Sequence, residues 1–274
     1  MGSHNKSTRP LDIIGVVPMA GRATRLAQLP CSKEIHPVEP RRGAYNADER
    51  PRAVCEYLLE KMREAGVTRA YVILREGKWD IPAHLGDGSM AGLHLAYLMM
   101  GLPYGTPYSV DQAYPFLQNA IVALGFPDMV LGPEDIFGKL LEYQRMCHAD
   151  VVLGLFPADR PDKVDMVEID SSGKVIQIVI KPQHTELRTT WGVAVWTPCF
   201  TRFMHEFLVS HQKIVDTEPE LFMGDIVQAG IREGLSVYGM QVSELPFIDI
   251  GTPDDLERVV GPSGESGCSP YKYP

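Results

Sequence analysis

The stretch Val16–Val38, VVPMAGRATRLAQLPCSKEIHPV, decides how this chain is interpreted. It continues an apolar run from Ile13 that is typical of a buried first strand. A turn of small residues follows, and then Arg22, Arg25 and Lys33. Backbone N–H groups exposed by such a turn bind anions, and lysine and arginine can hold different oxygens of one triphosphate. The stretch therefore indicates a phosphate-binding loop after the first strand.

An ordinary surface turn is the alternative, because small residues often follow a first strand and exposed arginines often only cover a surface. Two sharper phosphate-loop signatures are absent from the sequence, the G-x-x-x-x-G-K-[ST] loop and the G-x-G-x-x-G loop. Their absence argues against a P-loop NTPase and against a Rossmann dehydrogenase. From these residues alone, phosphate binding and a plain turn both stay open.

The composition is typical of one large domain with a full apolar core. The chain has 274 residues, of which 45% are hydrophobic, and a formal net charge of −9. That charge argues against a general nucleic-acid or anionic-membrane surface, although it allows a local cationic pocket. No apolar stretch is long enough to span a membrane, no export signal opens the chain, and the five cysteines lack paired spacing. We expect a cytoplasmic protein with reduced thiols and no structural zinc.

Strands and helices are predicted to alternate, which is typical of an α/β fold with a mostly parallel twisted sheet and helices on both faces. Residues 93–100 fit a strand or a short helix. We expect residues 1–10 to be a tag or a disordered N-terminus, 11–260 a single domain, and 261–274 a flexible tail. Strands are expected at 13–17, 69–74, 120–130, 151–156, 192–196, 235–242 and 247–250, with a hairpin over 165–180, and helices at 52–65, 136–146, 199–210, 224–233 and from Thr252 and Pro253, where Asp255 suits a capping box.

The opening stretch resembles the signature of the sugar-1-phosphate nucleotidylyltransferases, a glycine-rich loop G-x-G-T-R-L followed by a P-K or S-K pair and P-V. The S-K pair resembles that of glucose-1-phosphate thymidylyltransferases, whereas the P-x-A-G opening and the K-E pair are more similar to UTP–glucose-1-phosphate uridylyltransferases. Ala23 replaces the family's second glycine. The resemblance implies a Rossmann-like nucleotidyltransferase fold. It also implies nucleotide binding by Ala20, Gly21, Thr24 and Arg25, with Arg25 and Lys33 as catalytic cations at the phosphates.

Two later segments resemble the family's metal-binding motifs. Asp128, in GFPDMV, matches the aspartate of a G-D pair, although Pro127 replaces the glycine. Asp249, in FIDIGTPDDL, matches the aspartate of W-x-D-x-G-T-x-x-x-L. The resemblance implies that both carboxylates bind Mg²⁺, which prefers oxygen ligands and completes its shell with substrate phosphates. On their own, Asp128 fits a turn or helix cap and Asp249 fits an Asx turn.

Two further segments resemble substrate-binding parts of the family. Gln112 lies in the stretch that reads the nucleotide base in relatives, and its amide offers the donor and acceptor that a pyrimidine edge needs. Lys181 matches the lysine of an E-K-P motif, which implies a catalytic lysine that binds the sugar phosphate, together with Gly192. Ile180 replaces the glutamate of that motif, so the residue that reads sugar hydroxyls is missing there. Gln112 and Lys181 also fit solvated surface positions.

The resemblance runs from Ile13 to Val260. It implies Mg²⁺-dependent nucleotidyl transfer from a nucleoside triphosphate, with dTTP or UTP favoured, to a sugar-1-phosphate. Both substrates are anions, so neutralisation and alignment are the main tasks, and the ionised attacking phosphate needs no general base. Neither nucleic acid nor a membrane is an expected partner, and the resemblance allows a homo-oligomer.

An inactive relative that binds nucleotide or sugar nucleotide in a regulatory role is the alternative, and the replacements at Ala23, Pro127 and Ile180 favour it. Retention of the charged residues argues against it. A glycosyltransferase is disfavoured because no D-x-D motif ends a predicted strand.

Overall fold

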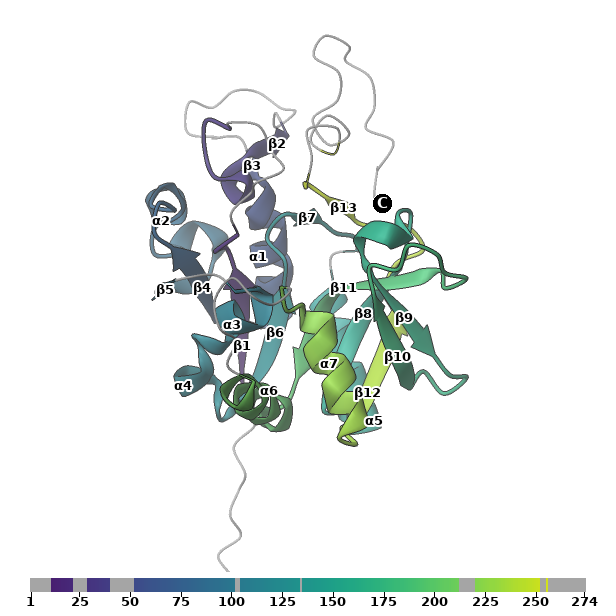
Figure 1. The fold of residues 1–274 in the computed structure, drawn as a ribbon. Coiled ribbons are helices and arrows are strands. Elements are labelled where there is room, and N and C mark those ends of the chain that lie inside the picture. Colours follow the sequence, from purple (N-terminus) through teal and green to yellow (C-terminus); the bar gives the residue numbers. More distant parts are fainter. Residues whose placement is uncertain are drawn as a thin grey trace, which may run out of the picture.

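The chain is described here by a computed structural model that covers residues 11–21, 29–39, 52–101, 104–133, 135–211, 220–251 and 255. Over these residues, a nine-stranded sheet forms the centre, and helices lie on both sides of it (Figure 1). Two small two-stranded sheets, β2–β3 and β7–β13, lie in the upper part of that view.

The elements have the following bounds. The strands are β1 Asp12–Pro18, β2 Pro37–Glu39, β3 Arg52–Ala53, β4 Arg69–Arg75, β5 His94–Met100, β6 Ala120–Gly125, β7 Met129–Val130, β8 Val151–Pro157, β9 Asp165–Ile169, β10 Val175–Ile180, β11 Thr189–Trp196, β12 Val237–Gln241 and β13 Ile248–Asp249. The helices are α1 Val54–Glu64, α2 Asp80–Leu85, α3 Thr106–Asp111, α4 Tyr114–Leu117, α5 Ile136–Cys147, α6 Pro198–Ser210 and α7 Met223–Arg232, with 3-10 turns η1 Lys33–Ile35, η2 Ser89–Ala91 and η3 Pro161–Lys163.

The central sheet is parallel around its first strand. β1 lies between β4 and β6, and β5 extends the sheet beyond β4, all in the same direction. β11 joins β6 in the antiparallel sense, and it also pairs antiparallel with β8 and with the β9–β10 hairpin. β12 then runs parallel to β8. These pairings confirm the predicted α/β fold and place the antiparallel strands in its second half.

Apolar side chains of the strands alternate between two buried layers. Val16 of β1 faces a cluster formed with α3, α6 and α7, whereas Val17 faces a cluster formed with α1, α2 and α5. Helices therefore cover both faces, as the sequence predicts. Helix α1 lies close against β6, because a Cβ atom added at Gly125 would lie 2.3 Å from Leu58 Cδ1. Gly125 thus lets the helix approach the strand that leads to Asp128.

Some predicted elements differ from the structure, and one open alternative is resolved. The strand expected over 120–130 ends at Gly125, and Met129–Val130 forms a separate short strand. The helix predicted over 52–65 begins only at Val54, because Arg52–Ala53 pairs with β2. Residues His94–Met100, for which a strand or a helix was possible, form a strand. The prediction that residues 247–250 close the central sheet is wrong. Ile248–Asp249 instead pairs with Met129–Val130 as a separate two-stranded ribbon.

The predicted last helix falls mainly outside the described residues, and Thr252 and Pro253 are among those left out. Asp255 is described in helical conformation and is buried, with Oδ1 2.7 Å from Arg160 Nη2. The proposed segments 1–10 and 261–274 also lie outside the described residues and stay predictions. No described helix is long and apolar enough to cross a membrane. The described cysteines carry free thiols: Cys31, Cys55, Cys147 and Cys199.

Candidate active site

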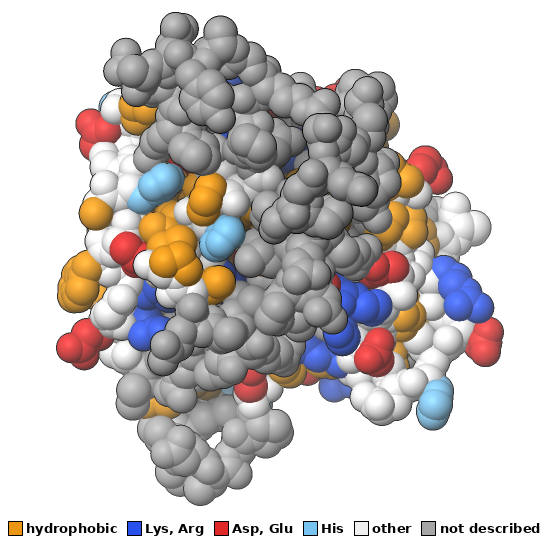
Figure 2. Space-filling view, turned by 90° about the horizontal axis from the view of Figure 1, so that it is seen from above, with side chains coloured by type: hydrophobic (Ala, Val, Ile, Leu, Met, Phe, Trp, Pro, Cys, Tyr) orange, Lys and Arg blue, Asp and Glu red, His pale blue; other side chains and the backbone are white. Residues whose placement is uncertain are grey.

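Three predicted residues follow parallel strands at one edge of the sheet. Because β1 and β6 are parallel, their carboxyl ends lie at the same edge. Ala20, which is buried, and Gly21, which is exposed, come directly after β1, and Asp128 comes after β6. Residues 22–28, with the predicted Thr24 and Arg25, lie outside the described residues. The described surface seen from this edge mixes Lys and Arg side chains with Asp and Glu (Figure 2).

The ammonium of Lys33 bonds to the carboxylate of Asp128. Lys33 opens the 3-10 turn η1, and its Nζ donates to Asp128 Oδ2. Both side chains are mostly buried, with exposed fractions of 15% and 19%. Burial disfavours the charged ammonium, but the charges of Asp128, Asp249 and Glu34 outweigh it and raise the pKa of Lys33 overall. The lysine therefore stays protonated beside its carboxylate.

The ribbon β7–β13 brings the second predicted metal ligand to the same place. Asp249 pairs with Met129, the neighbour of Asp128, and the Ile250 N–H donates to the Asp128 carbonyl at 2.9 Å. Burial raises the pKa of Asp249 to about 7, and the nearby charge of Asp128 adds to this shift while Lys33 opposes it. Lys33, Asp128 and Asp249 are thus brought together from three distant parts of the chain.

The donor set of this site suits a divalent cation that also binds substrate. The described residues contain no group of three or more His, Cys, Asp or Glu side chains that would enclose a metal ion. Two aspartates supply hard oxygen donors and leave most of a six-coordinate shell open. Mg²⁺ is commonly bound in this way, by one or two carboxylates plus phosphates and water. The residues present therefore fit Mg²⁺.

The turn that carries Lys33 is anchored on both sides, which the sequence interpretation missed. Ser32 donates to Asp80 twice, from its backbone N–H to Oδ2 at 2.6 Å and from Oγ to Oδ1 at 2.8 Å. On the other side, Lys78 Nζ donates to Glu34 Oε2 at 2.7 Å, and both side chains are buried. The only sequence signal was the K-E pair, since nothing around Lys78 and Asp80 forms a known motif. These contacts direct Ser32 and Glu34 toward α2, while Lys33 reaches Asp128.

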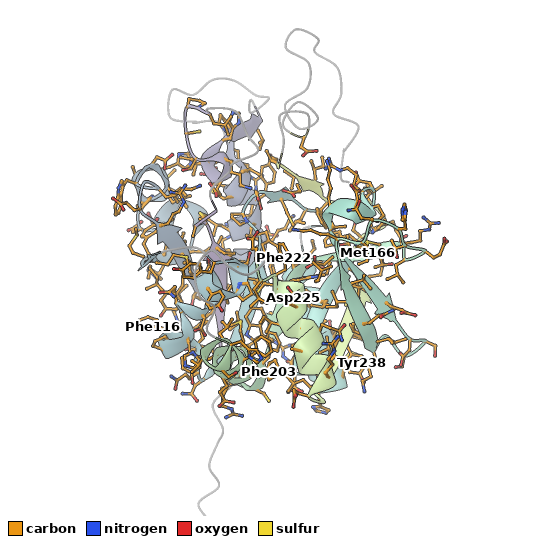
Figure 3. The ribbon with its side chains drawn as sticks, in the orientation of Figure 1. Phe116, Met166, Phe203, Phe222, Asp225 and Tyr238 are labelled. Atoms are coloured by element: carbon orange, nitrogen blue, oxygen red, sulfur yellow. The ribbon has the colours of Figure 1, made fainter. Side chains whose placement is uncertain are left out.

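The structure places Lys181 in a second cluster, at the amino-terminal end of α7. Its Nζ lies 3.6 Å from the centroid of the Phe222 ring, a cation–π distance. Asp225 Oδ2 accepts a hydrogen bond from the Phe222 N–H at 2.8 Å. Figure 3 shows Phe222 and Asp225 at the upper end of α7, with Met166 of β9 across from them. The carboxylate of Asp165, also on β9, interacts electrostatically with Lys181.

Gln112 is not brought to this edge of the sheet. It ends α3, its side chain is exposed, and its Nε2 donates to the Tyr108 carbonyl of the same helix at 3.3 Å. Its neighbour Asp111 contacts His205 of α6, which lies at the lower end of the view in Figure 1. Base reading by Gln112 therefore finds no support in this arrangement.

Gly192 lies beneath the ribbon that carries Asp249. It is the irregular residue in the β11–β8 pairing, between Trp191 and Val193. A Cβ atom added there would lie 3.2 Å from the Phe247 ring and 3.4 Å from the Met129 sulfur. Packing under Phe247 thus accounts for a glycine at this position, whatever its role toward a sugar phosphate.

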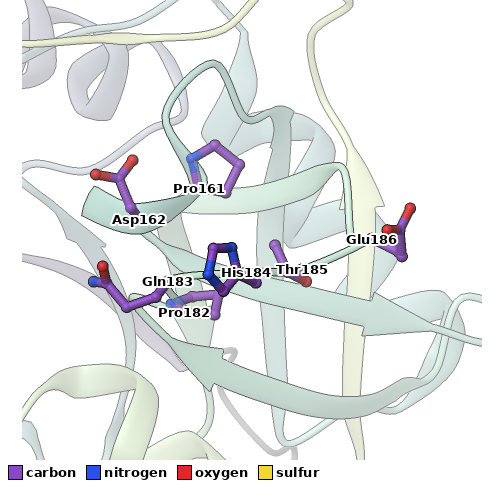
Figure 4. A pocket seen from close by; sticks show the side chains of 7 residues that line it. All are labelled: Pro161, Asp162, Pro182, Gln183, His184, Thr185 and Glu186. Carbon is purple, nitrogen blue, oxygen red and sulfur yellow. The ribbon is translucent and has the colours of Figure 1, made fainter.

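A surface cavity of about 420 Å³ follows Lys181 in the chain (Figure 4). It lies between η3 and the loop after β10, and most of its lining is polar. The side chains that line it are Pro161, Asp162, Pro182, Gln183, His184, Thr185 and Glu186.

Comparison with known proteins identifies the family. The sequence model described as nucleotidyl transferase matches residues 15–261, which is most of the chain. The chain belongs to the nucleotidyl transferase family. The predicted resemblance to sugar-1-phosphate nucleotidylyltransferases is thereby confirmed.

A low-salt glycan biosynthesis nucleotidyltransferase, Agl11 of Haloferax volcanii, is 26% identical over 205 residues, which are 74% of this chain and 55% of that protein. A glucose-1-phosphate thymidylyltransferase of Streptomyces antibioticus is 26% identical over 210 residues, again 74% and 55%. The chain therefore spans about half the length of these relatives. A crystal structure described as a glucose-1-phosphate thymidylyltransferase of Bacillus anthracis matches with a TM-score of 0.74 at 18% identity, over 90% of this chain and 94% of that one, and shows the same fold.

Proposed function

We propose that this protein transfers a nucleotidyl group from a nucleoside triphosphate to a sugar-1-phosphate in a Mg²⁺-dependent reaction that releases pyrophosphate. The observation that carries the proposal is the meeting of Asp128 and Asp249 beside Lys33, at the edge where the loop after β1 begins. Membership of the nucleotidyl transferase family supports it. So do the names of relatives, which include thymidylyltransferases and a mannose-1-phosphate guanylyltransferase.

Each residue of this cluster has a role that follows from its chemistry. Asp128 and Asp249 would hold Mg²⁺, which neutralises and aligns the phosphates of the triphosphate. Lys33 adds a protonated ammonium beside them, where negative charge moves toward the leaving pyrophosphate. The backbone of Ala20 and Gly21 would lie along the triphosphate, with Thr24 and Arg25 beyond them as proposed phosphate ligands.

The acceptor side of the reaction is assigned to Lys181. A sugar-1-phosphate oxygen attacks the α-phosphorus, the bond to the pyrophosphate breaks, and pyrophosphate leaves with the electron pair. The attacking phosphate is ionised near neutral pH, so no side chain has to remove a proton from it. Lys181 then needs only to hold that phosphate in line, and Gly192 is the second proposed residue on this side. A cytoplasmic location and homo-oligomer formation stay predictions.

The test is pyrophosphate release from a panel of nucleoside triphosphates and sugar-1-phosphates, with Mg²⁺ or with a chelator. Activity is expected for at least one pair and only with the metal, and dTTP and UTP are tested first. Asp128→Ala and Asp249→Ala should each lower kcat by about 10²–10³-fold, a loss typical of removing one charge-stabilising group. Asp12→Ala, whose carboxylate is 64% exposed at the start of β1, is the control and should keep its activity.

Two outcomes would overturn the proposal. Unchanged turnover by Asp249→Ala removes that carboxylate from the reaction. Tight nucleotide binding without turnover for every pair favours instead the inactive, regulatory relative, which the replacements at Ala23, Pro127 and Ile180 suggest.

A further inference from the structure

Asp165 is a half-buried carboxylate that the proposed chemistry does not use. It opens β9 and is the direct cross-strand partner of Ile180, the last residue of β10. Directly opposed residues of a strand pair place their side chains on the same face of the sheet. Both side chains reach α7, since a Cβ atom added at Gly224 would lie 2.6 Å from Asp165 Oδ2 and 2.6 Å from Ile180 Cδ1.

The backbone turns Lys181 toward the same cluster. In a regular strand, Lys181 would point to the face opposite Ile180, because successive side chains alternate. Lys181 instead has a φ of +40°, a left-handed conformation that is uncommon for a residue other than glycine. Its ammonium lies over Phe222, next to α7, and it attracts the Asp165 carboxylate. The unusual φ of Lys181 therefore goes together with a position of its ammonium close to the Asp165 carboxylate, at the amino-terminal end of α7.

The Phe222 N–H at the start of α7 has a partner other than Asp165, whose own contact with the helix is the Gly224 N–H. Asp225, at the third position of the helix, already accepts from the Phe222 N–H. Burial raises the pKa of Asp165 to about 6, and Asp225 adds to the shift, whereas Lys181 and the Gly224 N–H oppose it. An ionised carboxylate in such a place costs stability. Asp165 is nevertheless only half-buried as a residue.

We propose that Asp165 recognises the sugar of the sugar-1-phosphate. Its carboxylate accepts hydrogen bonds from sugar hydroxyl groups, while Lys181 holds the phosphate of the same substrate. This inference rests on the proposed function. In the motif that the sequence resembles, a glutamate precedes the lysine, and Ile180 stands there in this chain. The register shows a carboxylate directly across the strand pair from Ile180. The residue that binds the sugar hydroxyl groups is thus Asp165 on β9 and not the residue before Lys181 on β10.

The proposal predicts strong selection against sugars that lack the hydroxyl. An ionised carboxylate can only accept hydrogen bonds, and a deoxy sugar would leave one of the acceptor positions of this partly buried group unfilled. Sites that bind a hydroxyl in this way reject the analogue without it far more strongly than apolar sites reject a missing methylene. Asparagine at this position keeps the shape but loses the charge and one acceptor.

The test compares Asp165→Asn with Glu168→Gln, which removes the same charge from the opposite face of β9, where Glu168 accepts from Gln177. Activity is measured at pH 8, where the carboxylate is ionised, with a sugar-1-phosphate that the panel has identified and with its deoxy analogues. Asp165→Asn should raise the KM for the sugar-1-phosphate at least about tenfold, because a charged hydrogen bond is lost, and leave the KM for the nucleotide unchanged. Glu168→Gln should leave both KM values unchanged.

The deoxy analogues separate hydroxyl reading from a structural effect. For at least one deoxy analogue, the kcat/KM of the wild-type protein should be at least about tenfold lower than for the parent sugar-1-phosphate. For Asp165→Asn, the kcat/KM values for that analogue and for the parent should be nearly equal. The inference is overturned if Asp165→Asn changes both KM values equally, or if it discriminates against every analogue as strongly as the wild type does. If no nucleotide and sugar-1-phosphate pair reacts at all, the proposed function itself fails, which is a different result.

Discussion

The ammonium of Lys78 lies 2.7 Å from the carboxylate of Glu34, and the two side chains are only 5% and 2% exposed. Burial raises the pKa of Glu34 although the charge of Lys78 opposes the shift. A buried ion pair of this kind contributes little net stability, but removing one partner leaves a buried charge without compensation. Glu34 is the neighbour of Lys33 in the turn η1. The ion pair with Lys78 therefore holds this turn in place, and with it the lysine that contacts Asp128.

Lys78→Met should therefore destabilise the protein by about 3–5 kcal/mol, because Glu34 is left charged and buried. The double variant Glu34→Leu/Lys78→Met should recover most of that loss. Urea unfolding of the wild type, both single variants and the double variant gives the four free energies. If the double variant is as unstable as the sum of the single variants, the two residues do not act as a pair.

The pKa of Asp165 predicts a pH dependence of stability. This pKa is raised from 3.8 to about 6, by burial first and then by Asp225, against Lys181. The folded protein therefore binds the proton more tightly than the unfolded chain, so the contribution is stabilising below about pH 4 and is lost as the pH rises through 6. Asp165→Asn removes this dependence. The free energy of unfolding of the variant minus that of the wild type should therefore be about 1–3 kcal/mol larger at pH 7 than at pH 4.

Urea unfolding at several pH values between 4 and 8 checks this difference. Glu168→Gln is again the matched control, and its stability curve should run parallel to that of the wild type. A constant difference between Asp165→Asn and the wild type would show that the carboxyl has the same pKa in both states.

The packing of Gly192 predicts a coupling between β11 and the β7–β13 ribbon that carries Asp249. A side chain at this position must displace the Phe247 ring or the Met129 sulfur, which are 3.2 Å and 3.4 Å from the added Cβ. Gly192→Val should cost about 1–3 kcal/mol through overpacking. It should also lower kcat at least tenfold, because Phe247 lies two residues before Asp249.

Gly192→Ala should show a smaller effect in the same direction. Gly138→Ala is the control, since nothing lies within 4 Å of its added Cβ, and it should be as active as the wild type. Thermal unfolding and steady-state kinetics are the measurements. If Gly192→Val is fully active, packing at this position does not affect the ribbon that carries Asp249.

For Gln112, the resemblance predicts binding of the nucleotide base, whereas the structure gives no support for that role. Its amide is exposed and bonded within its own helix, so Gln112→Ala should change kcat/KM less than about twofold for every nucleotide, a difference of a few tenths of a kcal/mol. A selective loss of more than about tenfold for one base would restore Gln112 as the reader of that base.

The fold was largely predictable because buried strands and amphipathic helices leave a periodic apolar pattern. Val151–Phe156 and the hairpin around Ser171–Gly173 are examples, and both are found in the structure. Periodicity does not give the end of the sheet at which a residue lies, so it could not show that Gln112 ends α3 and bonds to the Tyr108 carbonyl. It also could not show that Ile248–Asp249, two residues long, pairs outside the central sheet.

The candidate site was predictable only where its residues lie in contiguous motifs. Lys33, Asp128 and Asp249 each belong to such a motif, and the structure brings them together. Lys78 and Asp165 do not. Their importance arises from a tertiary ion pair in one case and from strand register in the other, and neither relationship leaves a local pattern in the sequence.

The short pairing of Met129–Val130 with Ile248–Asp249 ties chemistry to the completion of folding. A nascent chain that has not yet emerged as far as Asp249 still lacks one of the two aspartates that we propose as ligands of the cation. Once that late segment is in place, the proposed cation between the two aspartates would fasten it to the rest of the molecule, since ligands stabilise the state that binds them. Magnesium ions and nucleotide would then protect Ile248–Asp249 from proteases, and the proposed site and the fold around it would be completed in the same step.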